Sequence, residues 1–362
     1  MTDRDDALRN ENVPASTAML GGAGPLEHLP PVRSQWWDVW DQFKHHRGAM
    51  FGAVFFGLVL AFVIFGDWVW RVDPTYSDIR ARNTRHIFAC FWHHDYPAVL
   101  GEARAWSLDA LWSCLSNPTE FQGLKVSWAH PLGTDQLGRD ILGRMIMGGT
   151  TSIAVGITAM LLAIFLGTLV GVLAGYFRGL DGVLMRLTDL FLALPLLPLL
   201  LVMVLLFRER LSAVFGPELG IFILIVVAIG VTSWMPTARI VRGDVLALKE
   251  REFVLAARSI GTRPGRMILR HVLPNVLSPI MVSATLGIAV AIITESALSF
   301  LGLGFPPDFP TWGRLLNDGV QYLQQFPERV IWPGTAISIA VLSINYLGDG
   351  LRDALDPRIR GM

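Results

Sequence analysis

Six stretches of this 362-residue chain contain no Asp, Glu, Lys or Arg and are each about long enough to cross a lipid bilayer. A transmembrane helix needs about 20 apolar residues to span a hydrocarbon core of about 30 Å. Because the backbone groups of such a segment must be satisfied internally, we expect all six stretches to be helices. They are residues 48–66, 150–177, 190–207, 219–238, 272–294 and 330–347. The second is longer than one bilayer requires, so it must tilt or extend beyond the membrane.

The composition agrees with this pattern. Apolar residues make up 52% of the chain and charged residues 17%, with a mean hydropathy of +0.47, whereas soluble domains carry about 25% charged residues. We therefore predict an all-α, polytopic membrane protein with six transmembrane helices.

The distribution of Lys and Arg predicts the orientation, since cytoplasmic loops carry an excess of both. With the N-terminus inside, the inner segments hold 18 of these residues and the short outer loops hold 4. Both termini are therefore expected in the cytoplasm. The expected organisation is a cytoplasmic segment (1–47), a first transmembrane helix (48–70), an extracytoplasmic insertion ending in a surface helix (71–147), a five-helix membrane domain (148–352) that contains a cytoplasmic loop (239–275), and a cytoplasmic tail (353–362).

The polar N-terminal segment has no early apolar run of the kind found in a cleavable signal peptide. Its end is aromatic, and a short helix there would place Trp36, Trp37, Trp40 and Phe43 on one side. Such a face suits either an interfacial helix or an aromatic belt at the start of the first span.

The insertion contains the only two cysteines, Cys90 and Cys114. An oxidising compartment allows a disulfide between them, which would contribute about 3 kcal/mol by closing a loop of about 25 residues. Metal binding is the competing interpretation, because potential ligands are dense here. These are His86, Cys90, His93, His94 and Asp95. Their spacing matches no standard zinc motif, so we assign no metal.

At the end of the insertion, Thr134 or Asp135 can cap a helix. Its apolar face would suit the outer membrane surface and comprises Ile141, Leu142, Met145 and Ile146. Within the second span, small residues at four-residue spacing predict close helix packing. They are Gly167, Gly171 and Gly175.

Polar and helix-breaking residues accompany the later spans. Pro195 and Pro198 are expected to bend the third span. At its start, Asp189 lies three residues after Arg186, which predicts a local ion pair. Glu295 lies near the outer end of the fifth span, where an ionisable group is costly. It either lines the translocation path or accepts hydrogen bonds that lock its helix to a neighbour.

The loop between the fourth and fifth spans has the composition of a docking element. Residues 244–260 include no Gly or Pro, Gly261 can end this helix in a left-handed conformation, and Pro264 can open a second one. The small Ala256 and Ala257 permit close approach of a partner, and apolar and basic residues flank them. The flanking residues are Phe253, Val254, Arg251, Arg258, Arg263 and Arg266.

The spacing of Ala256-Ala257, Gly261 and Leu273-Pro274 resembles the "EAA" coupling loop of ATP-binding-cassette (ABC) import permeases. Leu255 stands where that motif has its glutamate. Other strings are similar to the dipeptide/oligopeptide branch, and the likeness extends over about residues 36–362 except around 71–129. These strings are GTD (133–135), LGRD (137–140), ESALSFLGLG (295–304) and GDGLRDALDPR (348–358).

The resemblance implies a C-type permease subunit of a peptide importer in a bacterial or archaeal plasma membrane. It implies four kinds of partner besides lipid: a different permease, two ABC ATPases, an extracytoplasmic binding protein and the peptide itself. The coupling contacts would come from Phe253, Val254, Ala256, Ala257, Arg258, Gly261 and Pro274. No Gly-x-x-x-x-Gly-Lys-Ser/Thr motif is present, so ATP and magnesium are expected on the ATPases and no cofactor on this chain. We expect neither catalysis nor a nucleic-acid partner.

Three alternatives remain open. An importer of the same family could carry nickel chelates, glutathione or glycans. A secondary transporter driven by an ion gradient would need polar residues near the middle of the membrane, and these spans have almost none. A membrane receptor with the insertion as its binding module would leave the coupling loop without a role.

Overall fold

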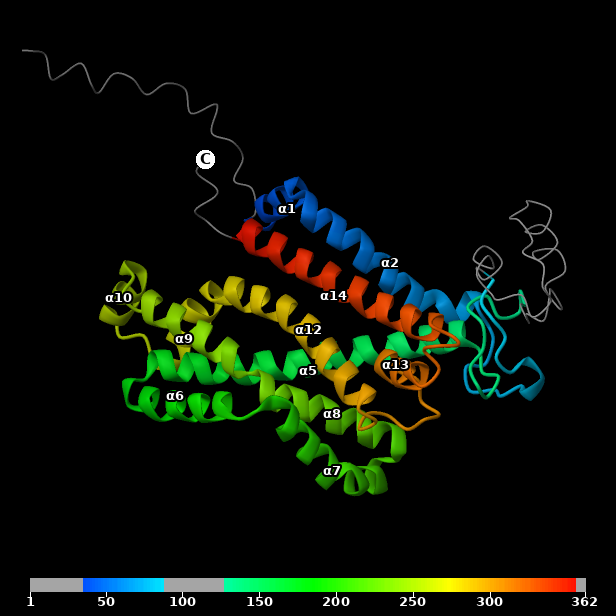
Figure 1. The fold of residues 1–362 in the computed structure, drawn as a ribbon. Coiled ribbons are helices and arrows are strands. Elements are labelled where there is room, and N and C mark those ends of the chain that lie inside the picture. The colour runs from blue at the N-terminus through cyan, green and yellow to red at the C-terminus, as the bar shows by residue number, and fades with distance from the viewer. Residues whose placement is uncertain (1–34, 88–126, 356–362) are drawn as a thin grey trace, which may run out of the picture.

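The computed structural model describes residues 35–87 and 127–355, and these form a bundle of helices around one long central helix (Figure 1). Its larger elements are α1 (Gln35–His45), α2 (Arg47–Val69), α5 (Ile141–Tyr176), α6 (Arg178–Ala193), α7 (Leu196–Phe215), α8 (Pro217–Ser233), α9 (Met235–Leu248), α10 (Glu252–Ser259), α12 (Leu277–Phe300), α13 (Trp312–Val320) and α14 (Glu328–Leu355). The short elements are η2 (Ile79–Ala81), α11 (Pro264–Met267), the π-helical turn η4 (Ile268–Val272) and η5 (Leu273–Asn275). The described residues contain no β-strand, which confirms the predicted all-α class.

Four of these helices, α2, α5, α12 and α14, are each long and apolar enough to cross a membrane. Two bent pairs, α6 with α7 and α8 with α9, raise the number to six if each pair is one span. At 1.5 Å per residue, the 36-residue α5 is about 54 Å long. The second predicted span therefore extends well beyond the hydrocarbon core.

The two bent pairs have proline at their breaks. The angle between α6 and α7 is 88°, and Leu194 and Pro195 form an extended connection there. A residue before proline is disfavoured from helical geometry, which explains the break. Pro198 lies within the first turn of α7, where no intrahelical N–H partner is lost. The angle between α8 and α9 is 41°, and Pro236 follows the break at Trp234.

The predicted surface helix, capped by Thr134 or Asp135, is corrected by the structure. No separate helix forms there, because the first turns of α5 already contain these apolar residues. The capping residue is Asp140, whose carboxylate accepts a hydrogen bond from the backbone N–H of Gly143 at 2.7 Å. Thr134 and Asp135 instead lie in the preceding loop.

Close contact between α5 and α9 organises the half of the bundle that lies toward α10. A Cβ added at Gly167, Gly171 or Gly175 would come within 2.7 Å of α9 or its start, at the Trp234 carbonyl, the Ala238 carbonyl or the Val245 side chain. The glycines therefore set the helix separation, and the predicted packing role is confirmed.

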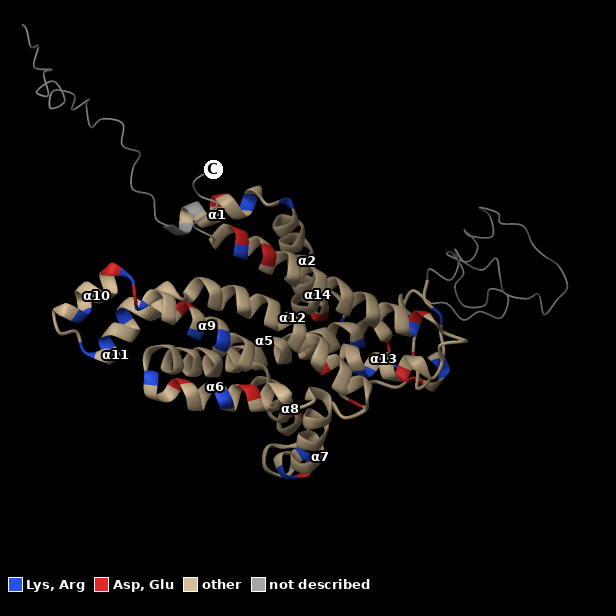
Figure 2. Ribbon diagram, turned by 60° about the vertical axis from the view of Figure 1, so that its left-hand side comes forward, with Lys and Arg blue, Asp and Glu red and all other residues tan. Residues whose placement is uncertain are grey.

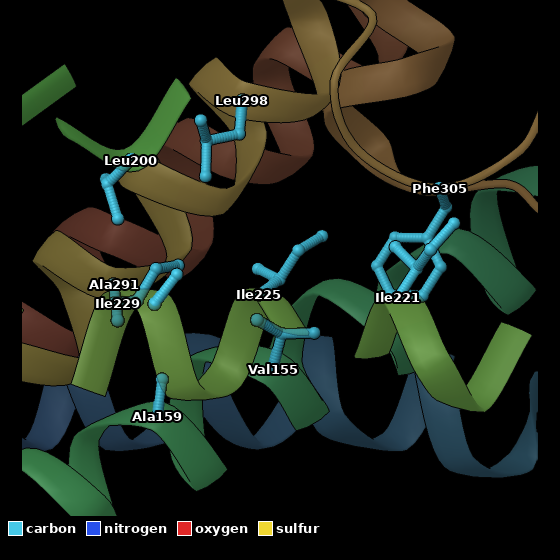
Figure 3. Close-up of a cluster of buried hydrophobic side chains, with 10 residues drawn as sticks. Val155, Ala159, Leu200, Ile221, Ile225, Ile229, Ala291, Leu298 and Phe305 are labelled. Atoms are coloured by element: carbon cyan, nitrogen blue, oxygen red, sulfur yellow. The ribbon is translucent and has the colours of Figure 1, made fainter. Parts of the chain in front are cut away.

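Farther along, α8 packs between α5 and α12 through a buried apolar cluster (Figure 3). It includes Val155, Ile225, Ile229 and Leu298. At the bundle periphery, α1 lies beside the end of α14. The ammonium group of Lys44 lies 5.2 Å from the centre of the Trp40 ring, and Trp37 is exposed.

Candidate functional site

The loop between α9 and α12 forms two short helices separated by a tight turn. The predicted helix 244–260 is interrupted after Leu248, and α10 begins at Glu252. At its end, Gly261 has φ +79° and donates its N–H to the Arg258 carbonyl at 3.0 Å, while Thr262 donates to the Ala257 carbonyl at 3.2 Å. This is a Schellman cap, the left-handed ending expected at Gly261. Pro264 then begins α11, as its fixed φ favours.

The two faces of α10 have different roles. Val254 and Ala257 are buried against Met267, Val272 and Val276 of the same chain. Their predicted role as docking contacts is corrected to one in the chain's own core, because an eight-residue helix must bury one face to be stable. Apolar side chains are nevertheless exposed around this buried pair, with Phe253 45% and Leu255 43% exposed within α10 and Ile260, directly after it, 84% exposed. Ala256 and Arg258 are also exposed, and so are Gly261 and Pro274.

Basic residues lie in and beside α10 and α11 (Figure 2). Arg251, Arg258, Arg263 and Arg266 are all exposed, and Glu252 is the single acid within α10. Leu255 and Ile260 are exposed here but were not among the coupling residues predicted from the sequence. Helical spacing could not have separated Ile260 from the buried side, since it follows Ala257 by three residues and is exposed because α10 ends at Ser259.

The helix that leads into the loop, α9, is joined to α6 by two ion pairs. The Arg242 guanidinium donates Nη2–H to Asp181 Oδ2 at 2.7 Å, and Arg239 pairs with Asp189. The expected Asp189–Arg186 pair does not form in the structure, because α9 runs beside α6 and places Arg239 opposite Asp189. These pairs, with the glycine contacts, join α9, the helix that leads into α10, to α6 and α5.

A second polar cluster lies at the opposite end of the bundle, before α5. Asp135 Oδ2 accepts hydrogen bonds from Arg139 Nε and Arg144 Nη1, each at 2.7 Å. Burial raises the pKa of the Asp135 carboxyl, but Arg144 and Arg139 outweigh that effect and leave the pKa below its ordinary value. Arg144 also approaches Asp318 of α13 at 3.4 Å. The Gly-Thr-Asp and Leu-Gly-Arg-Asp strings thus connect the loop before α5 to α5 and α13.

Glu295 is fully buried within α12. Its Oε1 accepts a hydrogen bond from Ser299 Oγ at 2.7 Å, and Ser296 Oγ lies 3.5 Å from Oε2. Within this chain it has no surface toward an open passage, so its geometry suits a hydrogen-bonded, structural role better than a path-lining one.

The cysteine and metal interpretations fall largely outside the described residues. Cys90 and Cys114 lie in 88–126, as do His93, His94 and Asp95. His86 is described, and its ring lies beside Glu328, with Nε2 4.0 Å from the carboxylate. In the described part of the chain, no group of three or more His, Cys, Asp or Glu side chains could hold a metal ion.

Two protein-family models match parts of this chain. Residues 163–361 match the model described as binding-protein-dependent transport system inner membrane component, and residues 34–85 match the N-terminal transmembrane domain of oligopeptide transport permease C. The chain belongs to the family of binding-protein-dependent transport permeases. It is a multi-pass membrane protein of the dipeptide/oligopeptide branch, as its sequence motifs predicted.

Curated relatives resemble this permease over most of its length. It is 34% identical to the oligopeptide transport system permease protein OppC of Bacillus subtilis (strain 168), covering 97% of this chain and 99% of the relative. It is 35% identical to the glutathione transport system permease protein GsiD of Escherichia coli O6:K15:H31, covering 94% and 96%. The dipeptide transport system permease protein DppC of Alkalihalophilus pseudofirmus is 41% identical over 64% of this chain and 73% of its own.

Proposed function

We propose that this chain is one of two different permease subunits of an ATP-driven importer that takes up short peptides. Its relatives are permeases of oligopeptide, dipeptide and glutathione transport systems. In this proposal an extracytoplasmic binding protein delivers the peptide, and two ABC ATPases act from the cytoplasm, where both termini lie. ATP is bound and hydrolysed by the ATPases, and this chain itself binds no cofactor.

The observation that carries the proposal is the exposed apolar surface on and directly after α10, made by Phe253, Leu255 and Ile260. An apolar surface on a short helix, with arginines beside it, suits the helix-in-groove mode of docking on another protein. When ATP draws the ATPases together, α10 moves with the groove that holds it. The motion passes through α9 to α5 by the glycine contacts and to α6 by the Asp181–Arg242 pair. ATP thereby biases the equilibrium between inward-open and outward-open states.

Purification under mild conditions tests this proposal directly. The tagged chain, extracted from its native membrane in mild detergent, is expected to retain a second permease and ABC ATPases. Reconstitution of that complex with its binding protein should give peptide uptake that requires ATP. A chain that purifies alone in several detergents and transports without an ATPase would contradict the importer proposal in favour of an ion-driven transporter.

The Schellman cap gives a sharper test of the coupling role. A Cβ added at Gly261 has no neighbour within 4 Å, so any effect there comes from its φ of +79°. Valine is strained in this conformation by about 1–2 kcal/mol, whereas asparagine tolerates it. We expect Gly261→Val to lower ATP-driven uptake severalfold and Gly261→Asn to keep most of it, measured at equal amounts of permease in the membrane. Equal uptake by the two variants would show that the capped geometry is not needed.

A further inference from the structure

A cavity of about 420 Å³ is lined by residues of both bent helix pairs and of α5 and α12. Met160 and Gly287 line it, and both lie near the middle of their helices, α5 and α12. The cavity is therefore within the membrane-spanning part of the bundle. Leu196 at the start of α7 and Pro236 at the start of α9 line it as well.

Breaks in membrane helices expose backbone groups that need partners. Pro236 has no N–H, so the Thr232 carbonyl cannot receive the hydrogen bond that a continuous helix would supply from that position. Both Thr232 and Pro236 line the cavity. Irregular backbone at membrane depth is tolerated only where it is buried in protein or lines a cavity. The α8–α9 break thus leaves the Thr232 carbonyl without its usual helical donor, in a residue that lines the cavity.

The remaining polar groups of the wall are few and uncharged. Thr237 Oγ1 and Ser283 Oγ form a hydrogen bond at 2.8 Å between α9 and α12, and Ser233 lies nearby on the wall. No Asp, Glu, Lys or Arg lines the cavity. A charged peptide terminus would therefore have no counter-ion here. Burying such an unpaired charge is costly, so the cavity does not suit a charged group. An apolar side chain would match the apolar wall of the cavity, and the amide N–H groups that flank it would match the hydrogen-bond acceptors on that wall.

The cavity volume limits the size of the group that can bind there. Pockets that take whole small molecules are about 300–1,000 Å³, so this cavity is near the lower end. A neighbouring helix, with a diameter of about 10–12 Å, is too wide to enter it. One or two side chains fit.

We propose that this cavity is a subsite for a bulky apolar side chain of the peptide in transit, with Val290 on its wall as a determinant of side-chain size. The proposal rests on the peptide-import function proposed above. The Thr232 carbonyl and the Thr237–Ser283 hydroxyl pair then accept hydrogen bonds from the peptide's amide groups.

A pair of variants on α12 tests the subsite. Val290 lines the cavity and is 55% exposed, whereas Ile293 is 48% exposed and lies outside the wall. In proteoliposomes that contain the complete transporter, Val290→Trp is expected to lower the ratio of Phe-Phe-Gly uptake to Gly-Gly-Gly uptake at least tenfold. The matched Ile293→Trp is expected to leave that ratio unchanged.

A reciprocal pair enlarges the cavity instead of filling it. Leu196 lines the cavity and is 37% exposed, and the adjacent Leu197 is 46% exposed and does not line it. Leu196→Ala is expected to raise the relative uptake of a tryptophan-containing tripeptide a few fold, and Leu197→Ala to leave it unchanged.

Each other outcome counts against the proposal in a distinct way. If wild-type transporter imports both peptides and the ratio is unchanged in Val290→Trp and Leu196→Ala, the subsite is overturned while peptide import stands. Loss of the second permease from the Val290→Trp complex would identify the cavity as a subunit contact and also overturn the subsite. A wild-type transporter that imports neither peptide would overturn the proposed function and the subsite with it.

Discussion

Replacing Ile260 with aspartate is expected to lower ATP-driven uptake at least tenfold without reducing the amount of permease in the membrane. Ile260 is 84% exposed in this chain, so folding does not depend on its burial. In the proposed docked state the side chain enters a groove of the ATPase, where an unpaired carboxylate costs several kcal/mol. Because each 1.4 kcal/mol is a factor of ten in an equilibrium constant, this cost is enough to release the ATPase.

The measurement is peptide uptake in proteoliposomes, together with the amount of ATPase that remains bound during purification. Ser259→Asp is the matched control, because it adds the same charge at the neighbouring exposed position of α10. We expect this control to keep most of the uptake and the bound ATPase. Normal uptake by Ile260→Asp would show that the apolar surface on and directly after α10 is not the docking surface.

Features governed by local chemistry were predictable from the sequence. The charge-free stretches identified the membrane helices because lipid leaves the backbone few alternatives. The left-handed ending at Gly261 and the helix start at Pro264 follow from the conformational preferences of these two residues. The glycine stripe of α5 was also predictable, since small residues at four-residue spacing share one face of a helix.

Features governed by contacts between distant segments were not predictable. Pro195 and Pro236 mark the two breaks, but the 88° and 41° angles depend on how α7 and α9 pack on their neighbours. Asp189 lies within reach of Arg186 by sequence, yet α9 brings Arg239 opposite it.

The exposed residues of α10 depended on packing in the same way. The sequence suggested Val254 as a docking residue, but in the structure it packs on Met267 and Val272 of the segment that follows α10. The exposure of Leu255 and Ile260 depends on that packing and on where α10 ends.

Asp135→Ala is expected to destabilise the end of the bundle where α5 begins by about 3–5 kcal/mol. Its carboxylate is the shared acceptor for Arg139 and Arg144, and Arg144 is only 1% exposed. Removing one member of a buried ion pair leaves the other charge without full compensation, which is the main source of such a cost. The measurement is the midpoint of thermal unfolding of the purified permease in detergent, which should fall by several degrees.

The chain offers a matched control in Asp308, which lies 3.9 Å from Arg139 but has a side chain that is 95% exposed. An exposed ion pair contributes about 0–1 kcal/mol, so Asp308→Ala should leave the midpoint almost unchanged. The pH dependence gives a further check. Because the pKa of Asp135 is held below its ordinary value, its contribution is complete above about pH 4 and is lost as the pH falls through the lowered pKa. The difference between wild type and Asp135→Ala should therefore persist at neutral pH and shrink in acid. A difference that is absent at neutral pH would mean that the buried arginines do not depend on this carboxylate.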